Sequence, residues 1–222
     1  MLEEKLNLNK SRLYSKKHPK QFGCFLFFTE CAIIQGMIVG ITGTNGSGKG
    51  ELATYLVTKG FVHLSVRSFL EKEIHARNVS HDRDSMRIIA NEMRQIYGPT
   101  HIIASLLNEA HLAGTDVVIE SVRCPAEAEL FKHVGLYLLA VDADVEVRYG
   151  RISARGSATD YVSREKFDTQ EKAEAEGVES WDLHIPQCVA QAHYTFHNNG
   201  SLDTLHVNID MWLASVENNL DV

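Results

Sequence analysis

The sequence predicts an α/β fold in which a parallel sheet is covered by helices on both faces. Short, almost continuously apolar segments alternate along the chain with segments whose apolar residues recur at helical spacing. Strands that are buried on both faces form such continuous apolar runs, and helices connect them in a parallel sheet. The length of 222 residues, with 44% hydrophobic and 23% charged residues, fits one globular domain with an insertion or a tail.

Strands are expected where apolar runs end in polar or glycine-containing segments, at residues 37–41, 61–65, 116–120, 135–142 and 194–197. Helices are expected at residues 51–57, 68–76, 82–96, 100–112, 125–133, from 145 to a break at 156–160, and at 163–175, 185–192 and 202–217. Asp82 is suited to cap the helix that follows it. Ligands bind at the carboxyl ends of parallel strands, so the residues that follow the strands are the candidates for a site.

The first strand is followed by a glycine-rich segment, Gly43-Thr44-Asn45-Gly46-Ser47-Gly48-Lys49-Gly50, and then by a helix that opens with Glu51. The spacing G-x-x-x-x-G-K between a strand and a helix is that of a phosphate-binding loop, or Walker A motif. The glycines let backbone N–H groups approach a polyphosphate, the helix N-terminus attracts the anion, and Lys49 adds a mobile positive charge. Gly50 departs from the pattern, since a Ser or Thr hydroxyl usually ligates magnesium there. A plain glycine turn would explain the glycines but not the lysine.

Charged residues near later strand ends extend this candidate site. Arg148, Arg151 and Arg155 are spaced to share one helix face, where Arg151 and Arg155 are predicted to bind phosphate oxygens. Arg148 fits a solvated surface equally well. Glu120 ends an apolar strand and is predicted to orient the acceptor or to reach magnesium through water, whereas Asp142 is better explained as a helix cap.

A second, phosphate-bearing substrate would need positive charge between the second and third strands. Arg67 and Arg94 lie in this helical region, and Arg94 precedes a Gly-Pro break that lets it point into a cleft. Arg123 follows Glu120 closely. We predict that these three arginines bind the substrate, and that Arg87 forms a surface ion pair.

Three segments together resemble the P-loop nucleoside monophosphate kinase superfamily. They are the loop, the segment 63–70 (His-Leu-Ser-Val-Arg-Ser-Phe-Leu), and the arginine helix before a polar insert. The Gly-Lys-Gly of the loop resembles that of adenylate kinases, although Glu51 replaces their usual threonine. Residues 188–205 are similar to dephospho-coenzyme A kinases, with His193 where an aspartate is expected. In the acceptor region, residues 120–123 do not match the Asp-Gly-Phe-Pro-Arg of adenylate kinases.

This resemblance spans roughly residues 37–213. It implies a P-loop NTPase fold with three α/β/α layers and a five-stranded parallel sheet. It further implies a kinase domain at 37–222, an acceptor-binding region at 67–113 and a lid at 148–184. Asn199 and Gly200 would lie near the adenine of ATP, and magnesium would be held mostly through water.

The resulting hypothesis is an ATP-dependent kinase of a nucleotide-like small molecule, with dephospho-coenzyme A and a (deoxy)nucleoside monophosphate as open alternatives. Lys49, Arg151 and Arg155 would act on the phosphates and Glu120 on the acceptor. The departures at Gly50, Glu51 and His193 motivate the alternative of an ATP-binding regulatory or scaffold protein. A nucleic-acid partner is disfavoured by the net charge of −7 and by the lack of a basic stripe.

Residues 1–36 differ from the rest, because a basic start is followed by an apolar stretch. We interpret them as a poorly ordered extension or an over-extended start before Met37, although organellar targeting stays open. The apolar stretch is too short to span a membrane, and no stable membrane association is expected. The scattered cysteines form no C-x-x-C pair, which favours a reducing compartment and a cytoplasmic location. The sequence does not give the oligomeric state.

Overall fold

The computed structural model describes residues 36–155, 163–179 and 181–220. Of the predicted extension at 1–36, residues 1–35 lie outside these residues, as does the predicted helix break at 156–160. Within them, none of the helices has both the length and the apolar composition that crossing a membrane requires.

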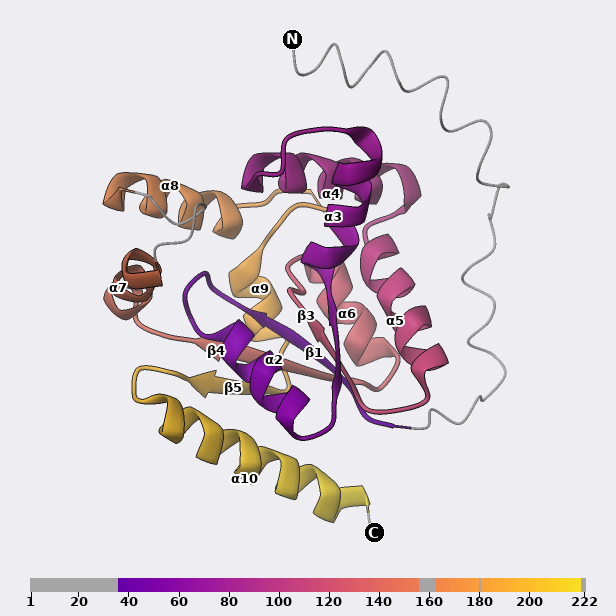
Figure 1. Ribbon diagram of the computed structural model, residues 1–222, viewed down its shortest axis with the longest axis vertical. Coiled ribbons are helices and arrows are strands. Elements are labelled where there is room, and N and C mark those ends of the chain that lie inside the picture. Colours follow the sequence, from indigo (N-terminus) through magenta and orange to yellow (C-terminus); the bar gives the residue numbers. More distant parts are fainter. Residues whose placement is uncertain (1–35, 156–162, 180, 221–222) are drawn as a thin grey trace. The chain divides into compact units, whose positions relative to one another are not determined.

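The five strands form one parallel sheet in the order β2-β3-β1-β4-β5, which confirms the predicted fold class (Figure 1). Their bounds are β1 Ile38–Gly43, β2 Val62–Ser65, β3 Val117–Glu120, β4 Tyr137–Asp142 and β5 Tyr194–His197. Because β1 is central, its carboxyl end lies between those of β3 and β4, with Ile41 paired to Glu120 and Gly43 paired to Val141. The glycine-rich loop, Glu120 and Asp142 therefore meet at one edge of the sheet.

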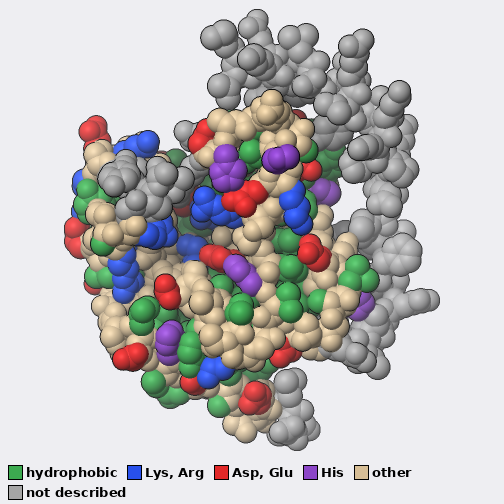
Figure 2. Space-filling model, viewed as in Figure 1, with side chains coloured by type: hydrophobic (Ala, Val, Ile, Leu, Met, Phe, Trp, Pro, Cys, Tyr) green, Lys and Arg blue, Asp and Glu red, His purple; other side chains and the backbone are tan. Residues whose placement is uncertain are grey.

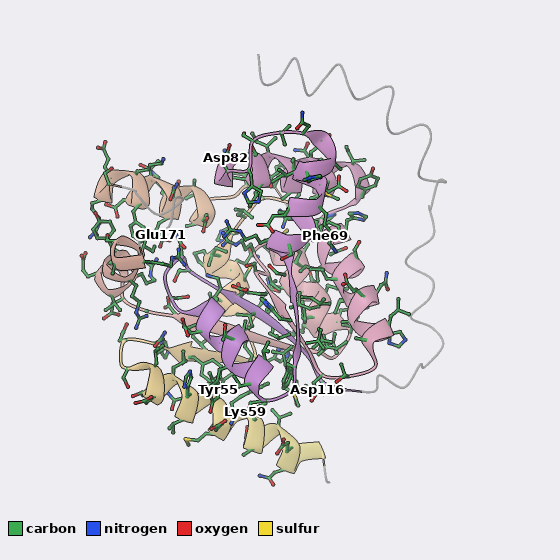
Figure 3. All side chains as sticks on the ribbon, in the orientation of Figure 1. Tyr55, Lys59, Phe69, Asp82, Asp116 and Glu171 are labelled. Atoms are coloured by element: carbon green, nitrogen blue, oxygen red, sulfur yellow. The ribbon has the colours of Figure 1, made fainter. Side chains whose placement is uncertain are left out.

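Helices cover both faces because successive strand residues point to opposite sides. Val117 and Ile119 of β3 join one apolar cluster, whereas Val118 joins the other. The first cluster packs α5 (His101–Ala113), α6 (Pro125–His133) and α9 (Ile185–Ala190) on the sheet. The second packs α2 (Lys49–Thr58) and α10 (Leu202–Leu220), and Tyr55 of α2 donates to Asp210 of α10 at 2.8 Å (Figure 3).

The remaining helices surround the carboxyl ends of the strands. They are α3 (Val66–Arg77), α4 (Arg83–Tyr97), α7 (Val145–Arg155) and α8 (Arg164–Ala175). Asp82 caps α4 as predicted, by accepting the N–H of Ser85 at 2.8 Å. The predicted start of α3 at Ser68 is wrong, because Ser65 accepts the N–H groups of Arg67 and Ser68 and begins the helix at Val66. At the other end of the chain, α9 ends at Ala190 rather than residue 192, and α10 continues past residue 217.

Candidate active site

The glycine-rich loop is shaped by close contacts that leave no room for side chains. Gly46 and Gly48 have φ angles of 77° and 109°, in the left-handed region that other residues rarely adopt. A Cβ on Gly46 would lie 2.7 Å from the carbonyl oxygen of Arg148, and one on Gly48 would lie 2.3 Å from Nδ2 of Asn198. The two glycines are therefore needed both for the turn and for the packing of α7 and of the segment after β5 against it.

Side chains from distant elements hold the loop carbonyls. Nδ2 of Asn198 donates to the carbonyl of Ser47 at 2.8 Å, and Nη1 of Arg148 donates to that of Asn45 at 3.3 Å. In a trans peptide the carbonyl of one residue and the N–H of the following residue point in opposite directions. The carbonyls of Asn45 and Ser47 point to their donors outside the loop, so the N–H groups of Gly46 and Gly48 face its inner side. Together with the N-terminus of α2, they form the kind of concavity that binds anions.

Lys49 lies inside this loop with only 7% of its surface exposed. Its Nζ donates to the carbonyl oxygens of Gly43 at 2.8 Å and Thr44 at 2.6 Å. The ammonium is thus held at the loop and lines the cavity beside it. This placement suits a group that neutralises phosphate charge.

Replacing Gly48 by alanine is expected to weaken nucleotide binding at least tenfold and to lower the melting temperature by several degrees. The new methyl group would collide with Asn198 at a backbone angle that alanine avoids, at a cost of about 1–3 kcal/mol. The measurements are calorimetric titration with ATP and thermal unfolding. Gly60→Ala is the matched control, because its φ is also positive, at 102°, but nothing lies within 4 Å of its Cβ position. Equal effects of the two substitutions would contradict a special role for the contact at Gly48.

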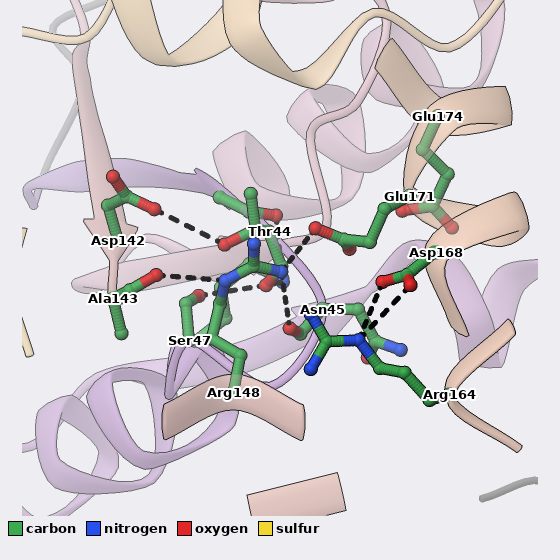
Figure 4. Close-up of polar contacts among 12 residues, drawn as sticks. Thr44, Asn45, Ser47, Asp142, Ala143, Arg148, Arg164, Asp168, Glu171 and Glu174 are labelled. Atoms are coloured by element: carbon green, nitrogen blue, oxygen red, sulfur yellow. Dashed lines mark hydrogen bonds and ion pairs between the residues drawn. The ribbon is translucent and has the colours of Figure 1, made fainter. Parts of the chain in front are cut away.

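The predicted arginine face exists, but its members have different surroundings. Arg148 is buried; its Nε donates to the carbonyl of Ala143 at 2.9 Å, and it forms an ion pair with Glu171 of α8 (Figure 4). Arg151 donates to the carbonyls of Ser47 and Gly200, each at 3.4 Å. Arg151 and Arg155 line the cavity, and Arg148 fastens α7 to the loop and to α8.

A cavity of about 740 Å³ opens beside the loop and continues toward α3 and α4. Figure 2 shows basic side chains gathered around a hollow on this face. The cavity lining contains most of the predicted site residues: Asn45, Gly46, Gly48, Lys49, Gly50, Glu51, Arg67, Arg94, Glu120, Arg123, Arg151, Arg155 and Gly200. Four predicted residues are not part of the lining: Gly43, Thr44, Ser47 and Asn199. The Oδ1 of Asn199 instead accepts the N–H of Asp144 at 2.7 Å, before α7 begins.

Glu120 ends β3 and lines the cavity. Its Oε2 accepts a hydrogen bond from Nε2 of His63 at 3.1 Å. Burial acts to raise the pKa of Glu120, but the hydrogen bond and charge of His63, with the charges of Lys49 and Arg123, outweigh it and lower that pKa. Glu120 is therefore a carboxylate at neutral pH. Asp142, at the end of β4, accepts a hydrogen bond from the Thr44 hydroxyl at 3.4 Å.

Arg94 reaches the far part of the cavity from α4. Only 2% of it is exposed, and its Nε and Nη2 donate to Oε1 of Glu127, which is fully buried, at 2.9 and 2.8 Å. Its Nη1 is buried and has no hydrogen-bond partner within the described part of the chain. Arg94 also lines the cavity, and a buried arginine donor without a partner is suited to bind an anion.

Other arginines of this part already contact carboxylates. Arg67 pairs with Glu71 of its own helix at 3.2 Å, and Arg123 pairs with Glu174 of α8 at 3.0 Å. Arg87, predicted as a surface residue, is exposed but also lines the cavity. The Arg67 pair is largely exposed and therefore weak. The three side chains of Arg67, Arg87 and Arg123 all line the cavity.

Sequence reasoning missed several residues of the site: His63, Glu127, Glu174 and Asn198. Glu127 alone carried a local signal, because it stands three residues after the residue that caps α6, as in a capping box. Its Oε2 accepts the N–H groups of Arg123 and Cys124 at 3.2 and 3.1 Å.

Comparisons with known proteins agree with this geometry. A family model described as an AAA domain matches residues 39–178, from the first strand through the loop and α8. The chain belongs to this AAA domain family. Among the relatives of this AAA domain, a UPF0200 protein of Pyrococcus abyssi is 27% identical over 187 residues, which are 81% of this chain and 97% of that protein.

Solved structures show the same fold for the AAA domain. TT1252 from Thermus thermophilus has a TM-score of 0.55 and 22% identity, covering 82% of this chain and 98% of that one. A shikimate kinase from Acinetobacter baumannii, in complex with shikimate, has a TM-score of 0.51 and 15% identity, covering 83% of this chain and 96% of that one. The predicted relationship to the P-loop nucleoside monophosphate kinase superfamily is confirmed, with an α/β P-loop kinase fold.

Proposed function

We propose that the protein is an ATP-dependent kinase that transfers a phosphoryl group to a small, anionic, nucleotide-like acceptor. The observation that carries this proposal is one cavity whose lining contains both the phosphate-binding loop and Arg94, whose buried Nη1 has no partner within the described residues. A kinase needs a donor site and an acceptor site in one water-excluding space. A regulatory nucleotide site would need only the first of these.

The donor half fits the polyphosphate of ATP. The inward N–H groups of Gly46 and Gly48 and the ammonium of Lys49 would bind its oxygens, and Gly200 would lie on the adenine side. Glu120 would hold magnesium beside the phosphates through a bridging water molecule. Its carboxylate is anionic and faces the first turn of α2. When bound, the ion would neutralise charge on the phosphates.

The protein's own groups would then assist the transfer. Arg151 and Arg155 would stabilise charge on the moving phosphoryl group, and Glu120 would orient the acceptor hydroxyl. Residues 148–184 would act as a lid and residues 67–113 as the acceptor-binding region. The ion pairs from α8 to Arg148 and Arg123 support a lid that touches both halves of the cavity.

The acceptor half indicates an anionic molecule with an apolar body. Its wall combines Arg67, Arg87, Arg94 and Arg123 with the apolar side chains of Val66, Leu70, Met86 and Ala90. An arginine fork binds phosphate or carboxylate oxygens, and the apolar wall would cover a base or another flat group. Dephospho-coenzyme A and a (deoxy)nucleoside monophosphate both satisfy this description.

The test is an acceptor screen on the full-length protein, with ADP release coupled to a spectroscopic assay and products identified by mass spectrometry. One acceptor is expected to stimulate ADP release far above background and to gain one phosphoryl group. Equal, feeble hydrolysis of ATP with every acceptor would contradict a kinase.

Replacing Arg94 by lysine is expected to raise the KM for the anionic acceptor by about tenfold or more, because the ammonium can pair with Glu127 but lacks the second arm of the fork. The KM for ATP should stay unchanged. The control is Arg77→Lys, since Arg77 also pairs with a glutamate, Glu92, at 2.9 Å but is not part of the cavity lining. An unchanged acceptor KM in the Arg94 variant would place the anion elsewhere.

A second candidate is an ATP-binding regulatory or scaffold protein with little turnover. It is favoured by His193, which stands where the dephospho-coenzyme A kinase pattern has an aspartate and whose Nδ1 accepts the N–H of Leu138 at 3.0 Å. The imidazole of His193 therefore stabilises the backbone at the start of β4 and has a structural role. Tight ATP binding without transfer to any acceptor in the same screen would select this candidate.

A further inference from the structure

We propose that His63 is a positioning residue for Glu120, which it holds so that one carboxylate oxygen faces the cavity at the phosphate-binding loop. This inference rests on the proposed function, since it assigns the orientation of the carboxylate that would direct the acceptor. The two oxygens of Glu120 have different surroundings. Oε2 accepts the hydrogen bond from Nε2 of His63 at 3.1 Å, and Oε1 lies 4.0 Å from the position of a Cβ on Gly50.

The sheet register brings His63 and Glu120 together. Ser65 of β2 is paired with Glu120 of β3, and His63 is paired with Val118. Side chains two residues apart on a strand share a face, so His63 and Glu120 are diagonal neighbours on the face to which Val118 points. Val118 packs in the same apolar cluster as α2, and therefore the first turn of α2, with Gly50, lies over this pair.

The backbone of Glu120 is already fixed. The next residue, Ser121, has a φ of 79°, and the N–H groups of Ser121 and Val122 both donate to the carbonyl of Ile41, at 3.1 and 3.0 Å. A glutamate side chain nevertheless retains several rotatable bonds. The imidazole of His63 restrains these bonds by holding the carboxylate. His63 contacts Glu120 from the solvent side, because 36% of the His63 side chain is exposed but only 20% of the Glu120 side chain.

Gly50 completes this arrangement. A Cβ there would lie 4.0 Å from Oε1, at ordinary van der Waals distance, so a longer side chain would compete for the space beside this oxygen. The departure from the usual hydroxyl residue thus leaves Oε1 open, while Lys49 and Arg123 supply positive charge nearby. Loss of the His63 contact should misorient the carboxylate without removing any group that binds ATP or the acceptor.

The first experiment measures kcat and both KM values for His63→Ala and His63→Gln. The alanine variant is expected to lower kcat about tenfold with both KM values within about twofold, a loss typical of outer-sphere partners of a functional carboxylate. Glutamine, which keeps a donor, should restore most of it. In a Glu120→Gln background His63→Ala should have no further effect. The control, His133→Ala, removes an exposed histidine at the end of α6. An unchanged kcat, or an equal loss in the Glu120→Gln background, would overturn the proposal.

The second experiment does not depend on turnover. Nitrogen-15 NMR should show the Nε2–H of His63 with the slowed solvent exchange and the shifted resonance of a proton that is hydrogen-bonded to a carboxylate, and Glu120→Ala should remove both. Absence of this signature would overturn the positioning contact whether or not the protein turns over. If the signature is present but no acceptor is phosphorylated, the contact stands and the proposed function fails.

Discussion

Replacing Lys49 by alanine is expected to lower kcat for phosphoryl transfer by about 10²–10³-fold, the size of effect seen when one preorganised charge is removed from a transition state. The side chain is 7% exposed, and its ammonium is held by the carbonyls of Gly43 and Thr44 inside the loop. No other described lysine lines the cavity, and the arginines of the lining lie outside the loop, on α3, α4, α7 and the segment after β3. Steady-state kinetics with the identified acceptor measures the effect, and circular dichroism checks that the fold is retained.

Lys59→Ala provides the matched control for this substitution (Figure 3). Lys59 follows the same helix, but its Nζ pairs with Asp210 at 2.7 Å and lies 4.8 Å from the centre of the Tyr55 ring. This exposed pair contributes little to stability, so kcat should stay at the parent value. A Lys49 variant that keeps full activity would contradict the role of the loop in catalysis.

Replacing Glu127 by glutamine is expected to lower the free energy of unfolding by about 3–5 kcal/mol, because it leaves the Arg94 guanidinium buried without a counter-charge. Glu127 is fully buried and accepts hydrogen bonds from Arg94 and from the N–H groups of Arg123 and Cys124. Loss of this carboxylate should also weaken acceptor binding. It holds two arginines of the cavity lining, Arg94 through its side chain and Arg123 through its backbone N–H. Urea denaturation followed by circular dichroism gives the stability.

Two further variants separate charge from packing in this prediction. The double substitution Arg94→Met/Glu127→Met should recover much of the stability, since a well-packed apolar pair can replace a buried ion pair. Glu92→Gln removes a more exposed partner of Arg77 and should cost much less. A stability of Glu127→Gln within about 1 kcal/mol of the parent would show that the pair is not energetically important.

Local patterns in the sequence were sufficient to predict the loop, all five strands and the cap at Asp82. These features depend on spacing and residue type within a few positions. Arg94 was predicted to face a cleft because of the Gly98-Pro99 break, but its partner Glu127 lies 33 residues further along the chain. No local pattern links two such positions.

Neighbouring residues in a turn illustrate the same limit. The Asn-Gly turn after β5 was predicted to lie near the nucleotide, with Asn199 and Gly200 as the binding residues. In the structure Gly200 lines the cavity, Asn198 holds the loop and Asn199 supports the start of α7. The pairing of His63 with Glu120 likewise required the order of the strands, because β2 and β3 are adjacent in the sheet but far apart in the sequence.

The contacts of the Asn45 and Ser47 carbonyls have a consequence for the phosphate-binding loop as a motif. Their donors, Arg148 and Asn198, lie 103 and 151 positions further along the chain. The octapeptide therefore specifies glycine conformations and a lysine, while its final shape is imposed by the second half of the chain. A loop that is rigid before phosphate arrives loses little conformational entropy on binding it. Transplanting the eight residues into another protein would carry the charge but not this preorganisation.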